Sequence, residues 1–170
     1  MKEKIYPHPF APVIFPDTEG LILGTFPSID SFGDGFYYGH KRNSFWKILS
    51  DIYSMPADDK ESKIRLLRSA KLGLWDMVAS CSRKNSLDSS LNNIKLNDIE
   101  ALLSRHRNIK RLFFTGKKAQ ELFDREFGHL DIAGSYLPSP SPAYAAMSYK
   151  QKREAYEEAF RGMREQKETE

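Results

Sequence analysis

The stretch "GLILG", residues Gly20–Gly24, decides the fold class, because it contains no polar side chain. A short apolar run closed by glycines is typical of a strand that is buried on both faces of a parallel sheet. The runs Leu72–Val78 and Ile109–Phe114 have a similar character, and Gly134–Leu137 is a weaker example. We therefore predict about four core strands, of which Gly20–Gly24 is the first.

Helical patterns lie between these runs. Apolar residues recur at helical spacing in four places, namely 45–53, 64–67, 102–103 and 117–127. Ser148 and Gln151 have the spacing of a capping box that would open a final helix. Strands that alternate with helices predict βαβ units with right-handed crossovers. The expected fold is an α/β three-layer sandwich with a central, mostly parallel sheet flanked by helices.

Composition favours one ordinary globular domain. The chain has 170 residues, of which 40% are hydrophobic and 29% are charged, and its formal net charge is +3. We predict a single domain, 1–170, with a core at about 20–165 and a flexible C-terminal end. Cys81 is the sole cysteine, which excludes an internal disulfide, and no apolar run of signal or transmembrane length begins the sequence. We expect a cytoplasmic protein with no membrane contact.

Three segments leave the predicted strands at the same edge of the sheet. They are 24–43, 76–88 and 137–144, and ligands of open parallel sheets bind where such segments gather. The first is long for an α/β connection, and connections of that length are often functional. The last alternates prolines with serines, which stiffens the backbone and leaves hydroxyl groups available. A rigid connector into the final helix is the alternative interpretation of this last segment.

These segments resemble one known family. The pieces "LILGTFPS", "YYGHKRNSFW", "GLWDMVASCSRKNSLDSS", "FFTGKKA" and "LPSPSPA" occur in the order found in the uracil-DNA glycosylase superfamily. The similarity is greatest to its hypoxanthine-DNA (deoxyinosine) glycosylase branch and covers the chain from Gly20 to the final helix. The resemblance implies a uracil-DNA glycosylase-like fold and an enzyme that extrudes a base from DNA and cleaves its N-glycosidic bond.

The resemblance implies Asn43 and His40 as catalytic residues. The uracil and mismatch branches carry Asp or Asn at the position of Phe26, and the hypoxanthine branch uses the asparagine that matches Asn43 instead. A carboxamide can orient water but cannot accept its proton at neutral pH. His40 would donate a hydrogen bond to the departing base. From the residues alone, Asn43 could equally cap the following helix, and His40 could be a structural histidine.

The resemblance also implies a base-binding pocket. Tyr38 would stack on the extruded base, Phe26 would form a second wall, and the carboxylate of Asp76 would accept a hydrogen bond from hypoxanthine N1–H. Backbone amides near Thr25 and Ser28 would stabilise the leaving base. The implied base-binding set is Gly24, Thr25, Phe26, Pro27, Ser28, Tyr38 and Asp76. Core packing of the aromatic residues is an alternative, as is a contact of Asp76 with a helix N-terminus.

DNA contacts are expected around the pocket. The candidates are Lys41, Arg42, Ser139, Pro140, Ser141 and Tyr144, with further basic residues at Lys150, Lys152 and Arg153. Tyr144 departs from the "SPANA" motif that is common in the family, so it could fill the gap left by the extruded base or reach the opposite strand. Basic residues on surface helices can also be merely solvated.

The leading prediction is a monofunctional DNA-deoxyinosine glycosylase of base excision repair that acts as a monomer on DNA with a deaminated base, without cofactor or metal. A uracil or thymine mismatch glycosylase is one alternative, and Phe26 argues against it. A non-catalytic nucleic-acid-binding module is the other. A lyase step needs a lysine Schiff base, and Lys41 is the one lysine in the "YYGHKRNSFW" piece that holds the candidate catalytic residues, so no lyase activity is expected.

Overall fold

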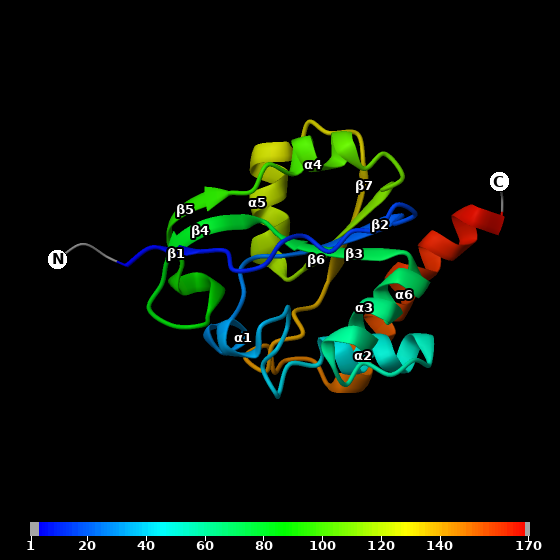
Figure 1. The fold of residues 1–170 in the computed structure, drawn as a ribbon, viewed down its shortest axis with the longest axis horizontal. Coiled ribbons are helices and arrows are strands. Elements are labelled where there is room, and N and C mark those ends of the chain that lie inside the picture. Colours follow the sequence, from blue (N-terminus) through cyan, green and yellow to red (C-terminus); the bar gives the residue numbers. More distant parts are fainter. Residues whose placement is uncertain (1–3, 169–170) are drawn as a thin grey trace.

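The computed structural model describes residues 4–168, which form three layers with a four-stranded sheet in the middle (Figure 1). The strands are β2 (Gly20–Gly24), β3 (Leu72–Asp76), β6 (Arg111–Thr115) and β7 (Ala133–Leu137). They lie in the order β3-β2-β6-β7, and each neighbouring pair is parallel. The predicted parallel sheet of four strands is therefore confirmed, and β2 lies near its centre.

Helices cover both faces of this sheet. Figure 1 shows α4 (Ile99–Arg105) and α5 (Lys117–Phe127) on one side. The other side carries α2 (Phe45–Tyr53), α3 (Lys60–Ala70) and α6 (Tyr149–Glu168). The predicted three-layer α/β sandwich is confirmed, including the bounds of α5.

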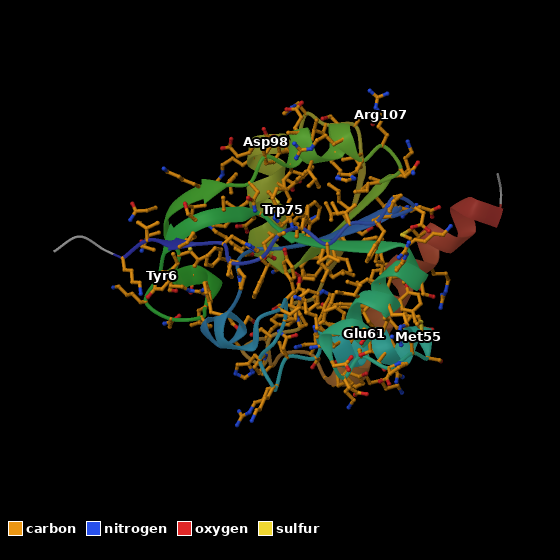
Figure 2. All side chains as sticks on the ribbon, in the orientation of Figure 1. Tyr6, Met55, Glu61, Trp75, Asp98 and Arg107 are labelled. Atoms are coloured by element: carbon orange, nitrogen blue, oxygen red, sulfur yellow. The ribbon has the colours of Figure 1, made fainter. Side chains whose placement is uncertain are left out.

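The alternation of side chains along β2 divides the core in two. Leu21 and Leu23 pack with α4 and α5, whereas Ile22 packs against α2, α3 and α6. All three side chains are fully buried, as expected for a strand covered on both faces. Figure 2 shows side chains around Trp75 of β3 that fill the spaces between the sheet and the helices on its two faces, whereas Arg107 projects outward. The core thus holds the carboxyl ends of the parallel strands in fixed positions.

A second, antiparallel sheet was not predicted. It contains β1 (Tyr6–Pro7), β4 (Val78–Ser82) and β5 (Asn92–Leu96) in the order β1-β4-β5. The predicted strand 72–78 is consequently wrong beyond Asp76, because the chain leaves the parallel sheet there and enters β4. The amides of Met77 and Val78 donate to the carbonyls of Gly24 and Thr25, which ties this crossing to the end of β2.

The long connection after β2 contains a short helix, α1 (Ile29–Asp34), which was expected to be loop. The Ser28 hydroxyl caps α1 by accepting a hydrogen bond from the Ser31 amide. A 3₁₀ turn at Asp88–Ser90 lies in the connection between β4 and β5.

The predicted capping box of the final helix is confirmed. The Gln151 Oε1 accepts from the Ser148 amide, and the Ser148 Oγ accepts from the Gln151 amide. The flexible end predicted beyond residue 165 stays a prediction, and residues 169–170 lie outside the described part of the chain.

Candidate active site

A cavity of about 620 Å³ opens at the carboxyl ends of the parallel strands. Gly24, Asp76 and Thr115 line it from the last positions of β2, β3 and β6. The three segments expected to gather at this edge all contribute to its wall. The full lining is Gly24, Thr25, Phe26, Pro27, Ser28, Ser31, Tyr37, Tyr38, His40, Asn43, Asp76, Asn85, Ser86, Leu87, Thr115, Ser139, Pro140, Ser141, Pro142, Ala143 and Tyr144.

The structure brings together nearly all of the residues implied by the sequence. Both candidate catalytic residues and all seven candidate base-binding residues line the cavity, as do Ser139, Pro140, Ser141 and Tyr144. Lys41 and Arg42 do not line it, and their side chains are exposed beside it. This location leaves the two basic residues accessible to a large anionic ligand at the surface.

Asn43 occupies a position that combines both of its proposed roles. Its Oδ1 accepts a hydrogen bond of 2.9 Å from the Phe45 amide, so the side chain does cap the start of α2. Ser44 is the formal N-cap residue, but its side chain makes no capping hydrogen bond. Because a carboxamide oxygen has two lone pairs and Asn43 also lines the cavity, the same oxygen can still accept from water.

His40 is held in one ring orientation. The Arg42 amide lies 3.0 Å from His40 Nδ1 and donates to it. A nitrogen that accepts a hydrogen bond carries no proton, so the remaining proton of the neutral ring sits on Nε2. His40 can therefore present an N–H donor to a ligand in the cavity.

Tyr38 has a conformation that fixes its ring at the cavity wall. Its φ of 54° lies in the left-handed region, which costs roughly 1–2 kcal/mol for a non-glycine residue. The ring stacks on Phe45 with centroids 3.9 Å apart, and the hydroxyl group is hydrogen-bonded to Thr115 Oγ1 at 2.9 Å. Its neighbours Phe36 and Tyr37 are buried in the core, as expected for part of this aromatic cluster.

The segment after β2 forms the inner wall. Phe26 is buried, and its ring contacts the rings of His8 and Phe32 as well as the Arg83 guanidinium. The Thr25 side chain is also buried in the wall, and its Oγ1 has no hydrogen-bond partner among the described residues. Buried hydroxyl groups are normally paired, so this atom is an exception within the wall.

Asp76 lies in the wall with only 4% of its surface exposed. Its Oδ2 is 2.7 Å from His8 Nε2, and the Gly24 amide also donates to its carboxylate. Burial raises the pKa of this carboxyl group, and the hydrogen bond and charge of His8 oppose that rise. The alternative interpretation, a contact with a helix N-terminus, is not what the structure shows.

The proline-rich segment is tied to the rest of the site through backbone atoms. The Pro140 carbonyl accepts from the Ser44 amide, and the Ser141 carbonyl accepts from Lys152 Nζ at 3.2 Å. Lys152 is only 5% exposed, so it supports the loop rather than lying free on the surface as a phosphate contact. Burial lowers the pKa of its ammonium group. The interpretation of this segment as a stiff connector is compatible with its place in the wall.

Several lining or supporting residues were missed by sequence reasoning. Thr115 ends β6, and Leu87 is an exposed apolar side chain at the cavity. His8 lies 68 positions from its partner Asp76, so no local spacing could reveal their contact. Asn85 and Ser86 belong to the segment 76–88 that was expected near the site, although no role was assigned to them.

The described residues 4–168 contain no cluster of three or more His, Cys, Asp or Glu side chains placed to hold a metal ion. None of their helices is long and apolar enough to cross a membrane.

The sheet with its cavity at the carboxyl ends of parallel strands defines a class of α/β proteins that bind ligands at this edge. The sequence profile of the uracil DNA glycosylase superfamily matches residues 12–163, so the chain belongs to that superfamily.

Individual relatives agree with this membership. A hypoxanthine DNA glycosylase from Methanosarcina acetivorans is 31% identical over 154 residues, which cover 89% of this chain and 96% of the relative. A hypoxanthine DNA glycosylase from Methanosarcina barkeri is 33% identical over 114 residues, covering 66% of this chain and 72% of the relative.

A solved structure is similar over almost its whole length. The solution NMR structure of a protein from Methanosarcina acetivorans, provisionally described as a uracil DNA glycosylase, superposes with a TM-score of 0.81 at 29% identity. The similarity covers 95% of this chain and 99% of that protein. The fold of the chain is therefore that of a uracil DNA glycosylase-like protein.

Proposed function

We propose that the chain is a monofunctional DNA glycosylase that removes hypoxanthine from deoxyinosine in DNA and leaves an abasic site. The observation that carries this proposal is the grouping of Tyr38, Asn43 and Asp76 around one cavity in a chain whose relatives are named hypoxanthine DNA glycosylases. The cavity volume of about 620 Å³ falls in the range of small-molecule sites and accommodates a purine. The protein acts as a monomer in the cytoplasm.

Base binding depends on stacking and on one carboxylate. An extruded base stacks against Tyr38, whose other face is covered by Phe45. The ionised Asp76 accepts the N1–H of hypoxanthine, whereas it repels adenine, whose N1 is itself an acceptor. The N3–H of uracil satisfies the same carboxylate, so Asp76 alone does not separate the two deaminated bases.

Bond cleavage proceeds through a cationic sugar. The C1′–N9 bond breaks with its electron pair going to the base, and the oxocarbenium-like sugar is then attacked by water. Asn43 orients that water, which releases a proton to solvent after attack, and the departing base anion takes up a proton from solvent. His40 Nε2–H and the Thr25 amide stabilise the negative charge that develops on the base. Phe26 cannot position water, which disfavours the mechanism of the uracil and mismatch branches.

DNA binding uses the rim of the cavity. Lys41 and Arg42 contact phosphates, and Ser139, Ser141 and Tyr144 contact the backbone next to the extruded nucleotide. Lys41 is exposed and does not line the cavity, so it cannot form a Schiff base at C1′ there. Borohydride should therefore trap no covalent complex with inosine-containing DNA.

The decisive assay compares bases in otherwise identical end-labelled duplexes. Inosine, uracil, a thymine mismatch and an alkylated purine are each incubated with the protein and treated with hot alkali, which cleaves abasic sites. Strand cleavage with inosine supports the proposal. Cleavage with uracil alone would overturn the substrate assignment, and salt-dependent DNA binding without cleavage of any strand would indicate a non-catalytic binding module.

Tyr38→Ala should weaken the processing of inosine-containing DNA, because stacking on a base contributes about 1–3 kcal/mol. Tyr38→Phe is the matched control, since it keeps the ring and removes only the hydrogen bond to Thr115. Single-turnover rates and DNA affinities of both variants measure the effect. Wild-type rate and affinity in Tyr38→Ala would mean that the ring only packs.

A further inference from the structure

The side chain of His8 is enclosed beside the cavity although it comes from the N-terminal segment. Its amide donates to the Ala79 carbonyl of β4, which anchors the residue to the second sheet. The side chain is 6% exposed, and its ring contacts the rings of Phe10, Phe26 and Tyr37 with centroids 5.7–5.9 Å apart. The ring is thus held in place by an aromatic cage.

Both ring nitrogens of His8 face an acceptor oxygen. Nδ1 lies 2.8 Å from the Phe10 carbonyl oxygen, and Nε2 lies 2.7 Å from Asp76 Oδ2. The Phe10 amide also donates to Nδ1, at 3.1 Å. Nδ1 therefore contacts both a donor and an acceptor of the backbone, whereas Nε2 contacts the Asp76 carboxylate and donates its N–H to it. The geometry thus gives Asp76 a buried N–H donor from His8.

Among the groups around Asp76, His8 stabilises the ionised carboxylate most. Tyr37 and Tyr38 face the carboxylate from the connection after β2, and Gly24 donates its amide from β2. Burial, with a further contribution from Asp76, raises the pKa of Tyr37, so this phenol stays neutral. Burial raises the pKa of Asp76, and the hydrogen bond from His8 is the largest effect that opposes this rise.

We propose that His8 is a positioning residue that holds Asp76 ionised and correctly oriented to accept a hydrogen bond from the base; this inference rests on the proposed glycosylase function. An isolated buried carboxylate would take up a proton, and its hydroxyl group would then compete with the N1–H of the base.

His8→Phe tests this role, because phenylalanine keeps a ring in the aromatic cage but has no N–H donor. Loss of the donor should raise the pKa of Asp76 and shift the acidic limb of the single-turnover rate profile upward by about one pH unit or more. The rate at neutral pH should fall by about tenfold, while affinity for undamaged duplex DNA stays the same.

The matched control is His129→Phe. His129 also faces a carboxylate, Glu100 at 3.4 Å, but both side chains are more than half exposed and lie outside the cavity. This variant should keep the wild-type profile. In an Asp76→Asn background, His8→Phe should cause little additional loss, because the carboxylate that His8 orients is already absent.

A readout that does not need activity separates the inference from the proposed function. Nitrogen-15 NMR of the His8 ring at neutral pH should show a protonated Nε2 whose resonance moves in Asp76→Asn. An unprotonated Nε2 in the wild type would overturn the hydrogen bond to Asp76. A rate that falls equally at all pH values, or a wild-type profile for His8→Phe, would overturn the positioning role. No cleavage of inosine DNA by the wild type would instead refute the glycosylase assignment.

Discussion

Asn43→Ala is expected to lower single-turnover cleavage of inosine-containing DNA by about 100-fold or more, because the attacking water loses the group that orients it. DNA affinity should stay close to that of the wild type, since Asn43 lines the cavity rather than the exposed rim. The variant should also lose about 0.5–2 kcal/mol of stability, because Asn43 Oδ1 accepts from the Phe45 amide at the start of α2. Rates, affinities and melting curves measure the three effects.

Asp98→Ala provides the matched control for the lost cap. Asp98 caps α4 through a hydrogen bond of 3.0 Å from the Ala101 amide, and it does not line the cavity. This variant should show a comparable fall in melting temperature with wild-type cleavage. If Asn43→Ala and Asp98→Ala lose equal stability and both cleave normally, Asn43 is a cap and not a catalytic residue.

Asn43→Asp separates the two roles further. Aspartate caps helices as well as asparagine does, so the melting temperature should be preserved. In the cavity, however, the substitution introduces a negative charge next to the departing base and a stronger acceptor for the water. We expect a clear change in the cleavage rate without a change in stability. An unchanged rate would contradict a position next to the reacting atoms.

Gly24→Ala is expected to reduce cleavage by about 100-fold through a displacement of the base-binding groups, since shifts near 1 Å have effects of this size. A Cβ at this position would lie 2.6 Å from Asp76 Oδ1, 3.0 Å from the Tyr38 hydroxyl and 3.1 Å from Thr115 Oγ1. The Asp76 carboxylate is held by His8, so it cannot move away without losing that contact. Single-turnover kinetics and a crystal structure of the variant would show both changes.

Gly20→Ala adds a methyl group at the opposite end of the same strand. There the new Cβ would meet Met163, Phe113 and Leu72 in the core, far along β2 from the cavity. This control should lower the melting temperature and leave the rate per folded molecule unchanged. Equal activity losses in the two variants would show that damage to β2 itself, and not to the pocket, explains the effect.

The parallel sheet could be predicted because its central strand is apolar at every position and is buried on both faces. The long helices were likewise visible in their periodicity, down to the capping box at Ser148. The second sheet was hidden, because β1 has two residues and β5, "NNIKL", is largely polar and exposed. Its strand β4 continues the apolar run of β3 across a sheet boundary that no local pattern marks.

The site could be predicted only in part, because some of its contacts join segments that are far apart in the sequence. Residues on the segments that leave the parallel strands could be placed together, since the topology gathers those segments at one edge. The contact between His8 and Asp76 depends instead on the path of the N-terminal segment across the second sheet. The capping hydrogen bond of Asn43 could be predicted from the residue type. Only the three-dimensional structure shows that the side chain that caps α2 also lines the cavity.

The cavity is stabilised from both ends of the described chain, and this has a consequence for its biosynthesis. His8 holds Asp76 from the N-terminal side, while Lys152 and Tyr156 of α6 donate to the carbonyls of Ser141 and Pro138. During translation the four parallel strands emerge from the ribosome before α6, so the proline-rich wall still lacks these two donors at that stage. A nascent chain therefore completes its pocket only after α6 has left the exit tunnel.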